Sequence, residues 1–393
     1  MGVYVGSLLH NSKAEDVTLI DLSKEFDVIV VGAGAAGIGV GITLENVGVE
    51  NFLIVDRDTV GSSFTSWPDE TRFITPSFPS NSIGMLDLNS IAIGISPAFS
   101  MKVEHPNGKE FADHLLDIAK YFDLPILQNT NVKNISKKKN IFTLECDEGN
   151  LLANNLIWAA GEFQYPNLNI FKGSELCLHN SQVRSWEHLE GDEFYIIGGF
   201  ESGMDAAVNL SKLGKKVNVL DRAAPWEEHT TDPSISLSPY TVERLREQIN
   251  HGRIKLIDNA DIQRITKKEN QYSIKIKGKS KPYVSETQPI LATGFKSSLT
   301  IVDKFFDWEP EKSYALINDE DESTKTPGLF LVGPQVRHEN LIFCFIYKYR
   351  QRFGVVANSI GNRLGLDTAV LEQYRHEGLY LDDLSCCGDE CEC

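Results

Sequence analysis

The sequence predicts an α/β protein made of two similar three-layer units, each with a parallel sheet, in which the second unit is inserted into the first. Two observations carry this prediction. An apolar run, a glycine-rich turn, a helical pattern and another apolar run follow one another over residues 26–56, and again over residues 194–221. Three further apolar runs end in small residues and glycine. We expect the chain to cross between the two units at these segments, which we call the returns.

The first unit reads FDVIVVGAGAAGIGVGITLENVGVENFLIVDRD. Residues 26–31 are apolar and β-branched, which is typical of a buried parallel strand. Gly32, Gly34 and Gly37 then satisfy G-x-G-x-x-G: the first makes a tight turn, the second lets the backbone approach a pyrophosphate, and the third brings the helix against the strand. Asp56 ends the next strand, where a carboxylate accepts hydrogen bonds from a ribose diol. The pattern predicts a Rossmann-like dinucleotide-binding domain.

The second unit reads FYIIGGFESGMDAAVNLSKLGKKVNVLDR, with strands predicted at residues 194–197 and 217–220. The residues expected to hold its nucleotide are Gly198, Gly199, Glu201, Ser202 and Gly203. Phe200 replaces the middle glycine, so a decayed structural repeat is the alternative to nicotinamide binding. Asp221 suits a free ribose 2′-hydroxyl and Arg222 suits a 2′-phosphate, which leaves NADPH and NADH open.

Two dinucleotide units in one chain imply that a nicotinamide nucleotide reduces a bound flavin. The predicted cofactors are therefore FAD and NADPH, or FAD and NADH. The returns between the domains read LIWAAGEFQYP, PILATGF and TPGLFLVGP. Their turn residues are candidate cofactor contacts, namely Ala160, Gly161, Thr293, Gly294 and Gly333.

The order G-A-G-A-A-G, A-A-G, G-G-x-E-S-G-x-D-A, A-T-G and G-L-F-L-V-G resembles flavin-containing monooxygenases and the related two-dinucleotide-domain flavoproteins associated with cation-efflux operons. The resemblance covers residues 26–393 and implies that the NAD(P) domain is inserted in the FAD domain. The expected divisions are an N-terminal extension at 1–25, the FAD domain at 26–188 and 291–384, the NAD(P) domain at 189–290, and a Cys-rich tail at 385–393.

The resemblance also implies that the stretch GSSFTSWPDETRFITPSFPSN passes along the flavin ring. An ordinary crossing loop is the alternative for this stretch. The expected catalytic residues are Arg72, Ser77 and Asn81. The further expected cofactor contacts are Ala36, Arg57, Ser63, Phe64, Trp67, Thr75, Val132 and Asn340.

Several departures from the family pattern bear on the reaction. The monooxygenase fingerprint F-x-G-x-x-x-H begins at Phe171 and meets Cys177 at the histidine position, with His179 two residues later. Pro334 stands where disulfide reductases of this superfamily place a flavin-binding aspartate, which monooxygenases also lack. No C-x-x-C or C-x₄-C pair lies near either nucleotide motif, and Cys344 falls in an apolar, aromatic helix pattern that favours a core position.

These features predict an FAD-dependent oxidoreductase that uses NAD(P)H, with a monooxygenase acting on a small soft nucleophile as the leading hypothesis. A reductase of a disulfide or metal species is the first alternative. A metal-binding or metal-delivery protein with a vestigial flavin is the second.

The chain closes on SCCGDECEC. Four cysteines with interleaved carboxylates suit a soft metal ion, so the candidate ligands are Cys386, Cys387, Cys391 and Cys393. There are two alternatives for this tail. The adjacent thiols of Cys386 and Cys387 could carry electrons between the flavin and a substrate, or the Cys-rich end could have no function.

Composition excludes several partners. The formal charge of −17 disfavours the phosphate backbone of nucleic acid, and no apolar run is long enough to span a bilayer. The N-terminus lacks a basic region and a cleavage site, and the scattered cysteines Cys146, Cys177 and Cys344 form no disulfide pattern. We expect a cytoplasmic protein with a small-molecule substrate and a possible oligomeric state.

Overall fold

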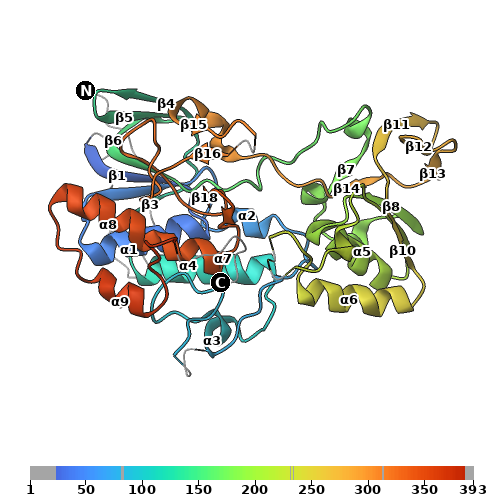
Figure 1. The fold of residues 1–393 in the computed structure, drawn as a ribbon, viewed down its shortest axis with the longest axis horizontal. Coiled ribbons are helices and arrows are strands. Elements are labelled where there is room, and N and C mark those ends of the chain that lie inside the picture. The colour runs from blue at the N-terminus through green and yellow to red at the C-terminus, as the bar shows by residue number, and fades with distance from the viewer. Residues whose placement is uncertain (1–23, 81–83, 231, 233, 312–313, 386–393) are drawn as a thin grey trace.

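The computed structural model describes residues 24–80, 84–230, 232, 234–311 and 314–385. The chain forms two lobes side by side (Figure 1). The larger lobe contains both the N-terminal strands and the C-terminal helices, and the middle of the chain forms the smaller lobe. In the part of the chain that the structure describes, every helix is too short or too polar to cross a membrane.

The larger lobe is built around a seven-stranded sheet of order β3-β2-β1-β6-β5-β4, with β17 also paired to β6. Its central strands β1, β2 and β6 are parallel, and Val30 lies between Ile54 and Ile157 in register. Strands β4 and β5 continue the sheet as an antiparallel extension of β6. The strand bounds are β1 (Glu25–Val31), β2 (Phe52–Val55), β3 (Ile126–Leu127), β4 (Val132–Lys138), β5 (Ile141–Cys146), β6 (Gly149–Trp158) and β17 (Leu329–Leu331).

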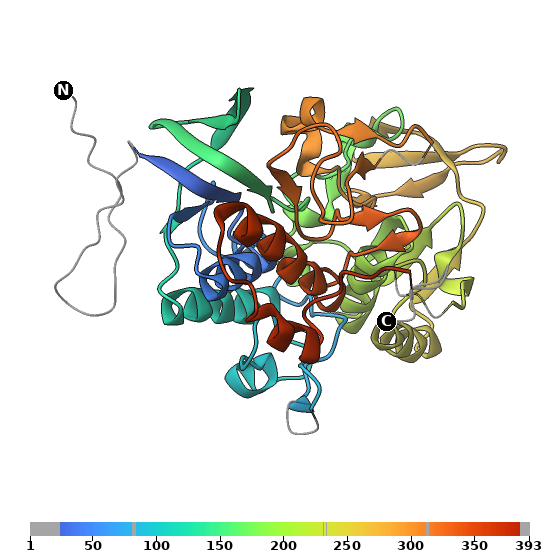
Figure 2. The same cartoon turned by 60° about the vertical axis from the view of Figure 1, so that its left-hand side comes forward.

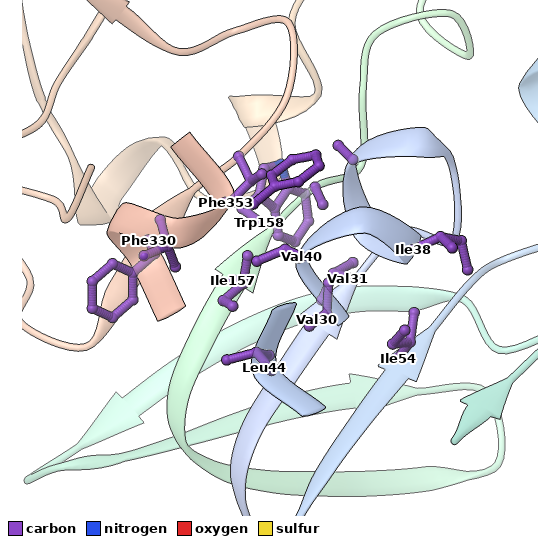
Figure 3. Packing of buried hydrophobic residues seen from close by; sticks show 14 of the residues in the cluster. Val30, Val31, Ile38, Val40, Leu44, Ile54, Ile157, Trp158, Phe330 and Phe353 are labelled. Carbon is purple, nitrogen blue, oxygen red and sulfur yellow. The ribbon is translucent and has the colours of Figure 1, made fainter. Parts of the chain in front are cut away.

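Helices α1 and α8 pack side by side on this sheet, and both views show them together (Figures 1 and 2). Figure 3 shows the core beneath them, where Val40 of α1, Trp158 of β6 and Phe353 of α8 come together. The helices are close because Gly39 has no side chain: a Cβ there would lie 2.1 Å from the Phe353 ring. The helices of this lobe are α1 (Ala35–Val47), α2 (Ser62–Thr65), α3 (Pro97–Met101), α4 (Gly108–Tyr121), α7 (Ile346–Tyr349), α8 (Phe353–Leu364) and α9 (Leu371–His376).

The smaller lobe contains a five-stranded parallel sheet of order β10-β9-β8-β14-β7, covered by α5 and α6. Its strands and helices are β7 (Leu178–His179), β8 (Glu193–Ile197), β9 (Lys216–Leu220), β10 (Ile254–Ile257), β14 (Ile290–Leu291), α5 (Glu201–Lys212) and α6 (Pro239–Asn250). An antiparallel meander, seen at the right of Figure 1, follows with β11 (Ile262–Lys268), β12 (Gln271–Ile276) and β13 (Tyr283–Ser285). The predicted fold class, two three-layer α/β units, is confirmed.

Two strand pairs stand apart from these sheets, and both lie in the last third of the chain. They are β15 (Asp307–Trp308) with β16 (Ala315–Leu316), and β18 (Arg337–His338) with β19 (Leu341–Ile342). The short strand β7 belongs to the smaller lobe although it precedes residue 189, the expected start of that domain.

A buried ion pair fixes the C-terminal segment to the larger lobe. Arg352 at the start of α8 donates from Nε and Nη2 to the two carboxylate oxygens of Asp321, at 2.9 and 2.8 Å, and neither side chain is exposed to solvent. His338 also contacts this carboxylate, at 2.6 Å. Because both charges are withdrawn from water, each depends on the other for compensation.

We predict that Asp321→Asn lowers the free energy of unfolding by about 3–5 kcal/mol, because it leaves a buried guanidinium without its counter-charge. Asp382→Asn is the matched control, since Asp382 forms a similar two-point pair with Arg375 on the surface. Its cost should stay below about 1 kcal/mol. Urea denaturation of both variants checks the difference, and equal costs would show that the burial of Arg352 is not what matters.

Candidate active site

A pocket of about 450 Å³ lies where the two lobes meet. Its lining includes the first glycine turn, the start of α5 in the smaller lobe, and the segment that leads into α7. Both predicted nucleotide-binding units therefore contribute to one cavity.

The first glycine turn has the geometry that a dinucleotide requires. Gly32 has φ +114°, and a Cβ on Gly37 would lie 1.8 Å from the Gly32 carbonyl oxygen, so the turn and the helix touch through backbone alone. A Cβ on Gly34, in contrast, would meet nothing within 4 Å. Gly34 lines the pocket and caps α1 without a side-chain hydrogen bond, which leaves the first N–H groups of the helix available to an anion. The turn fits the pyrophosphate of FAD.

Asp56 stabilises this turn through hydrogen bonds to the backbone. Its carboxylate accepts hydrogen bonds from the backbone N–H of Ala33 at 2.7 Å and of Asp58 at 2.8 Å. Burial raises the pKa of Asp56 and outweighs these hydrogen bonds, which lower it. Asp56 and Arg57 both line the pocket beside the glycine turn.

The second glycine turn repeats the first. Gly198 has φ +106°, and a Cβ on Gly203 would lie 1.9 Å from the Gly198 carbonyl oxygen. The Asp221 carboxylate accepts from the Gly199 N–H at 2.8 Å, as Asp56 does in the first unit.

The two turns differ at their middle position. Phe200 adopts φ −90° and ψ −165°, close to the −83° and −169° of Gly34, so the backbone is the same and a side chain has been added. That side chain packs against the core of the smaller lobe. A Cβ on the neighbouring Gly199 would lie 2.5 Å from the Trp226 ring. A pyrophosphate can therefore approach the first turn more closely than the second.

Most of the predicted contact residues line the pocket. Those that do are Gly32, Gly34, Ala36, Asp56, Arg57, Ser63, Phe64, Trp67, Arg72, Thr75, Val132, Ala160, Gly161, Glu201 and Ser202. Those found outside its lining are Gly37, Ser77, Gly198, Gly199, Gly203, Arg222, Thr293, Gly294, Gly333 and Asn340. Asn340 lies in an exposed turn between β18 and β19, and Arg222 is exposed at the end of β9. Asn81, Cys386, Cys387, Cys391 and Cys393 lie outside the described residues.

Asn89, which the sequence did not single out, lines the pocket and contacts Ser77. Ser77 is buried behind the pocket and accepts a hydrogen bond from Asn89 Nδ2 at 2.9 Å. Asn89 itself lines the pocket, and its Oδ1 is buried without a hydrogen-bond partner. The sequence carries no signal for this residue, because an irregular loop separates it from the glycine turn.

The returns between the lobes bring aromatic rings into the pocket. Phe163 and Phe295 follow the A-A-G and A-T-G turns, and their ring centroids are 5.0 Å apart. Asn180 Oδ1 and Trp186 Nε1 are also buried without partners, and both residues line the same cavity. The two rings could have been found from sequence, since Phe163 and Phe295 lie one or two residues after the predicted glycines Gly161 and Gly294. Asn180 and Trp186 could not.

The His179 ring contacts the A-T-G return. Its Nε2 donates to the Gly294 carbonyl at 3.1 Å, its Nδ1 accepts from the Ser181 N–H at 3.2 Å, and burial lowers its pKa. Cys177, which occupies the fingerprint's histidine position, is a half-buried side chain packed in another cluster, and burial raises its pKa to about 12. His179, two residues after the histidine position of the fingerprint, therefore makes the contact with the A-T-G return, and Cys177 does not.

Cys344 departs from its expected position. Cys344 was expected within a helix and in the core. It instead precedes α7 and lines the pocket. Its thiol donates to Ser234 Oγ at 3.1 Å, and burial raises its pKa. Among the described residues, no group of three or more His, Cys, Asp or Glu side chains is arranged to hold a metal ion.

The contrast between two glycines of the first turn is testable. We expect Gly34→Ala to leave the folded apoprotein intact but to weaken FAD binding, because its Cβ enters open space that the pyrophosphate needs. Gly37→Ala should instead impair folding, because its Cβ has no space beside the Gly32 carbonyl. Thermal unfolding of the apoproteins and FAD titration separate the two effects. Full FAD affinity in a folded Gly34→Ala protein would contradict this assignment.

Known proteins share this architecture. The oxidoreductase CzcO of Bacillus velezensis is 31% identical over 192 residues, which is 48% of this chain and about half (52%) of that relative's length. The bacillithiol disulfide reductase Bdr of Staphylococcus aureus has the same fold, with a TM-score of 0.71 at 20% identity over 86% of this chain and 99% of that one. A flavin-containing monooxygenase from Stenotrophomonas maltophilia matches with a TM-score of 0.68 at 15% identity, over 86% and 99% of the two chains.

These neighbours comprise a reductase and a monooxygenase that share one fold with this chain. The pyridine nucleotide-disulphide oxidoreductase model matches residues 29–333 and so covers both nucleotide units. The chain is a member of the pyridine nucleotide-disulphide oxidoreductase family.

Proposed function

We propose that the protein is an NAD(P)H-dependent flavin monooxygenase that oxygenates a sulfur, nitrogen or selenium centre of a small molecule. The observation that carries this proposal is the 450 Å³ pocket between the lobes, which joins the first glycine turn to an aromatic wall formed by Phe163, Phe295 and Phe345. Pro334 also lines the pocket, at the place where the resembling disulfide reductases carry a flavin-binding aspartate.

Bound FAD would supply the redox chemistry, namely acceptance of a hydride from the nicotinamide and transfer of electrons to dioxygen. The chain's own groups provide the surroundings for that chemistry. Gly34 and the uncapped N-terminus of α1 bind the pyrophosphate. The aromatic wall excludes water and accommodates an apolar substrate, while the free Oδ1 of Asn89 accepts a hydrogen bond within the cavity.

Glu162 is a candidate group to hold a proton in this pocket, because its carboxyl group, unlike that of Glu201, accepts no hydrogen bond from the backbone of the described residues. It follows the A-A-G return and lines the cavity beside Phe163. Its side chain keeps exposed surface because the pocket is open, yet desolvation by the surrounding protein raises its pKa. A carboxyl group of raised pKa is suited to general acid–base transfer.

The direct test is oxygen incorporation. Methyl phenyl sulfide, NADPH and ¹⁸O₂ should give NADP⁺, water and a sulfoxide that carries one labelled oxygen atom, measured by mass spectrometry. NADPH consumption that yields only hydrogen peroxide with several soft nucleophiles, including an amine and a selenide, would contradict monooxygenation.

Reduction of a small disulfide is the second candidate, and Cys344 is the observation that favours it. Of the cysteines that the structure describes, Cys344 alone lines the pocket. The buried Lys348 lies nearby and donates a hydrogen bond to Asp232 at 2.9 Å. The raised pKa of Cys344 disfavours the attacking thiolate. The tail cysteines lie outside the described residues and belong to this alternative as a proposed soft-metal or thiol-exchange arm.

A cysteine-to-serine variant separates the two candidates. We expect Cys344→Ser to retain sulfoxide formation to within a few-fold, because the thiol is a wall residue in the proposed monooxygenase. NADPH-dependent reduction of cystine or oxidised glutathione by the unmodified protein, with at least a hundredfold loss in Cys344→Ser, would favour the reductase instead. Cys177→Ser is the control for an unrelated half-buried thiol.

A further inference from the structure

A second cavity, of about 400 Å³, lies at the junction of the two lobes. Arg72 reaches it from the larger lobe, Asn209 and Lys212 from the end of α5, and Tyr240 and Arg244 from α6. We call it the junction cavity. It is lined by polar and charged side chains on both sides, unlike the aromatic pocket described above.

The base of the junction cavity carries hydrogen-bond donors that have no acceptor. Arg244 is only 8% exposed, donates from Nη1 to Asp205 at 2.9 Å and lies over the Tyr240 ring, yet its Nε and Nη2 are buried without partners. Asn209 is also 8% exposed, and its Nδ2 lacks a partner. Buried donors that stay unpaired cost stability, so this set is suited to receive acceptor atoms.

The acidic groups around the cavity do not satisfy these donors. The Glu70 carboxylate accepts from the Ser185 hydroxyl at 2.5 Å and from the Trp186 N–H at 3.1 Å. Burial raises the pKa of Glu70, but these hydrogen bonds outweigh it and lower the pKa overall, so the group is an anion with its own donors. Asp69 and Glu187 are exposed at the rim, where water screens their charge.

The junction cavity adjoins the nucleotide pocket, and the two share Arg72 in their linings but no other residue. Thr71 donates to Asp205 at 2.7 Å, and both residues line the nucleotide pocket, whereas Arg244 on the other side of Asp205 lines only the junction cavity. The cavity also lies toward the far end of α5 from the second glycine turn, because Glu201 begins the helix and Lys212 ends it.

We propose that the junction cavity binds a small oxyanion, a carboxylate or a phosphate. Two of its oxygens accept from Nε and Nη2 of Arg244, the planar fork that guanidinium groups offer to such anions, and Asn209 Nδ2 donates alongside. Lys212 and Arg72 add positive charge from the two sides of the junction. Because the anion contacts both lobes, its binding stabilises their docked arrangement by linkage.

The probes are inorganic phosphate and succinate, titrated separately by calorimetry into the FAD-loaded protein at constant ionic strength. Saturating NADP⁺ is present, so that the nucleotide-phosphate sites are filled. The unmodified protein should show one saturable site for at least one anion. Binding of phosphate alone, of succinate alone or of both identifies the source of the oxyanion.

Substitutions then locate the site. Arg244→Lys keeps the charge next to Asp205 but removes the fork, and it should weaken binding by about tenfold or more, as loss of a charged hydrogen bond does. Lys212→Ala, at an exposed position that does not affect folding, should weaken it by about two- to fivefold. Lys216→Ala is the control, since it removes the same charge from an exposed site at the start of β9.

Two results would overturn the proposal. One is the absence of a saturable site for both anions. The other is an equal loss of affinity in Lys212→Ala and Lys216→Ala, which would reduce the effect to overall charge. If Arg244→Lys does not fold, the comparison of Lys212 with Lys216 still decides the question. A failure of NADP⁺ to bind would affect the proposed enzyme activity but not this comparison.

Discussion

The close approach of backbone to backbone at the two glycine turns is the constraint on which the rest of the structure depends. A Cβ on Gly37 or Gly203 would lie within 2 Å of the carbonyl oxygen of Gly32 or Gly198, so neither helix could pack there with any side chain. This packing places the N-termini of α1 and α5 next to the carboxyl ends of β1 and β8. The nucleotide pocket forms because both helices begin at that edge.

Docking of the lobes then closes the pocket. The Thr71–Asp205–Arg244 chain joins the loop after α2 to both helices of the smaller lobe, and the His105 and Tyr240 rings stack at 3.7 Å between centroids. A buried pair of Lys348 and Asp232 adds a contact on the α7 side. Most of these contacts are hydrogen bonds and ion pairs, as is typical of interfaces between domains of one chain. An oxyanion in the junction cavity would add to them.

Sequence predicted the elements whose pattern is local. The strands predicted at 194–197 and 217–220 are observed at Glu193–Ile197 and Lys216–Leu220. Family membership confirms FAD and NAD(P)H as the cofactor pair of an oxidoreductase. Positions set by tertiary contacts could not be predicted. Asn89, Asn180 and Trp186 line one cavity although they come from a loop and two single-turn helices far apart in the sequence. Cys344 lies outside a helix because α7 begins only at Ile346, two residues after it.

The central claim is that the first glycine turn and the start of α5, which follows the second turn, line one pocket. A nicotinamide bound to the smaller lobe can then reduce a flavin bound to the larger. Anaerobic mixing of the FAD-loaded protein with NADPH or NADH in a stopped-flow spectrometer tests it most directly. The account predicts bleaching of the flavin absorbance at a rate that saturates with nucleotide concentration, despite the side chain of Phe200. A flavin that dithionite bleaches but neither nucleotide reduces would contradict it.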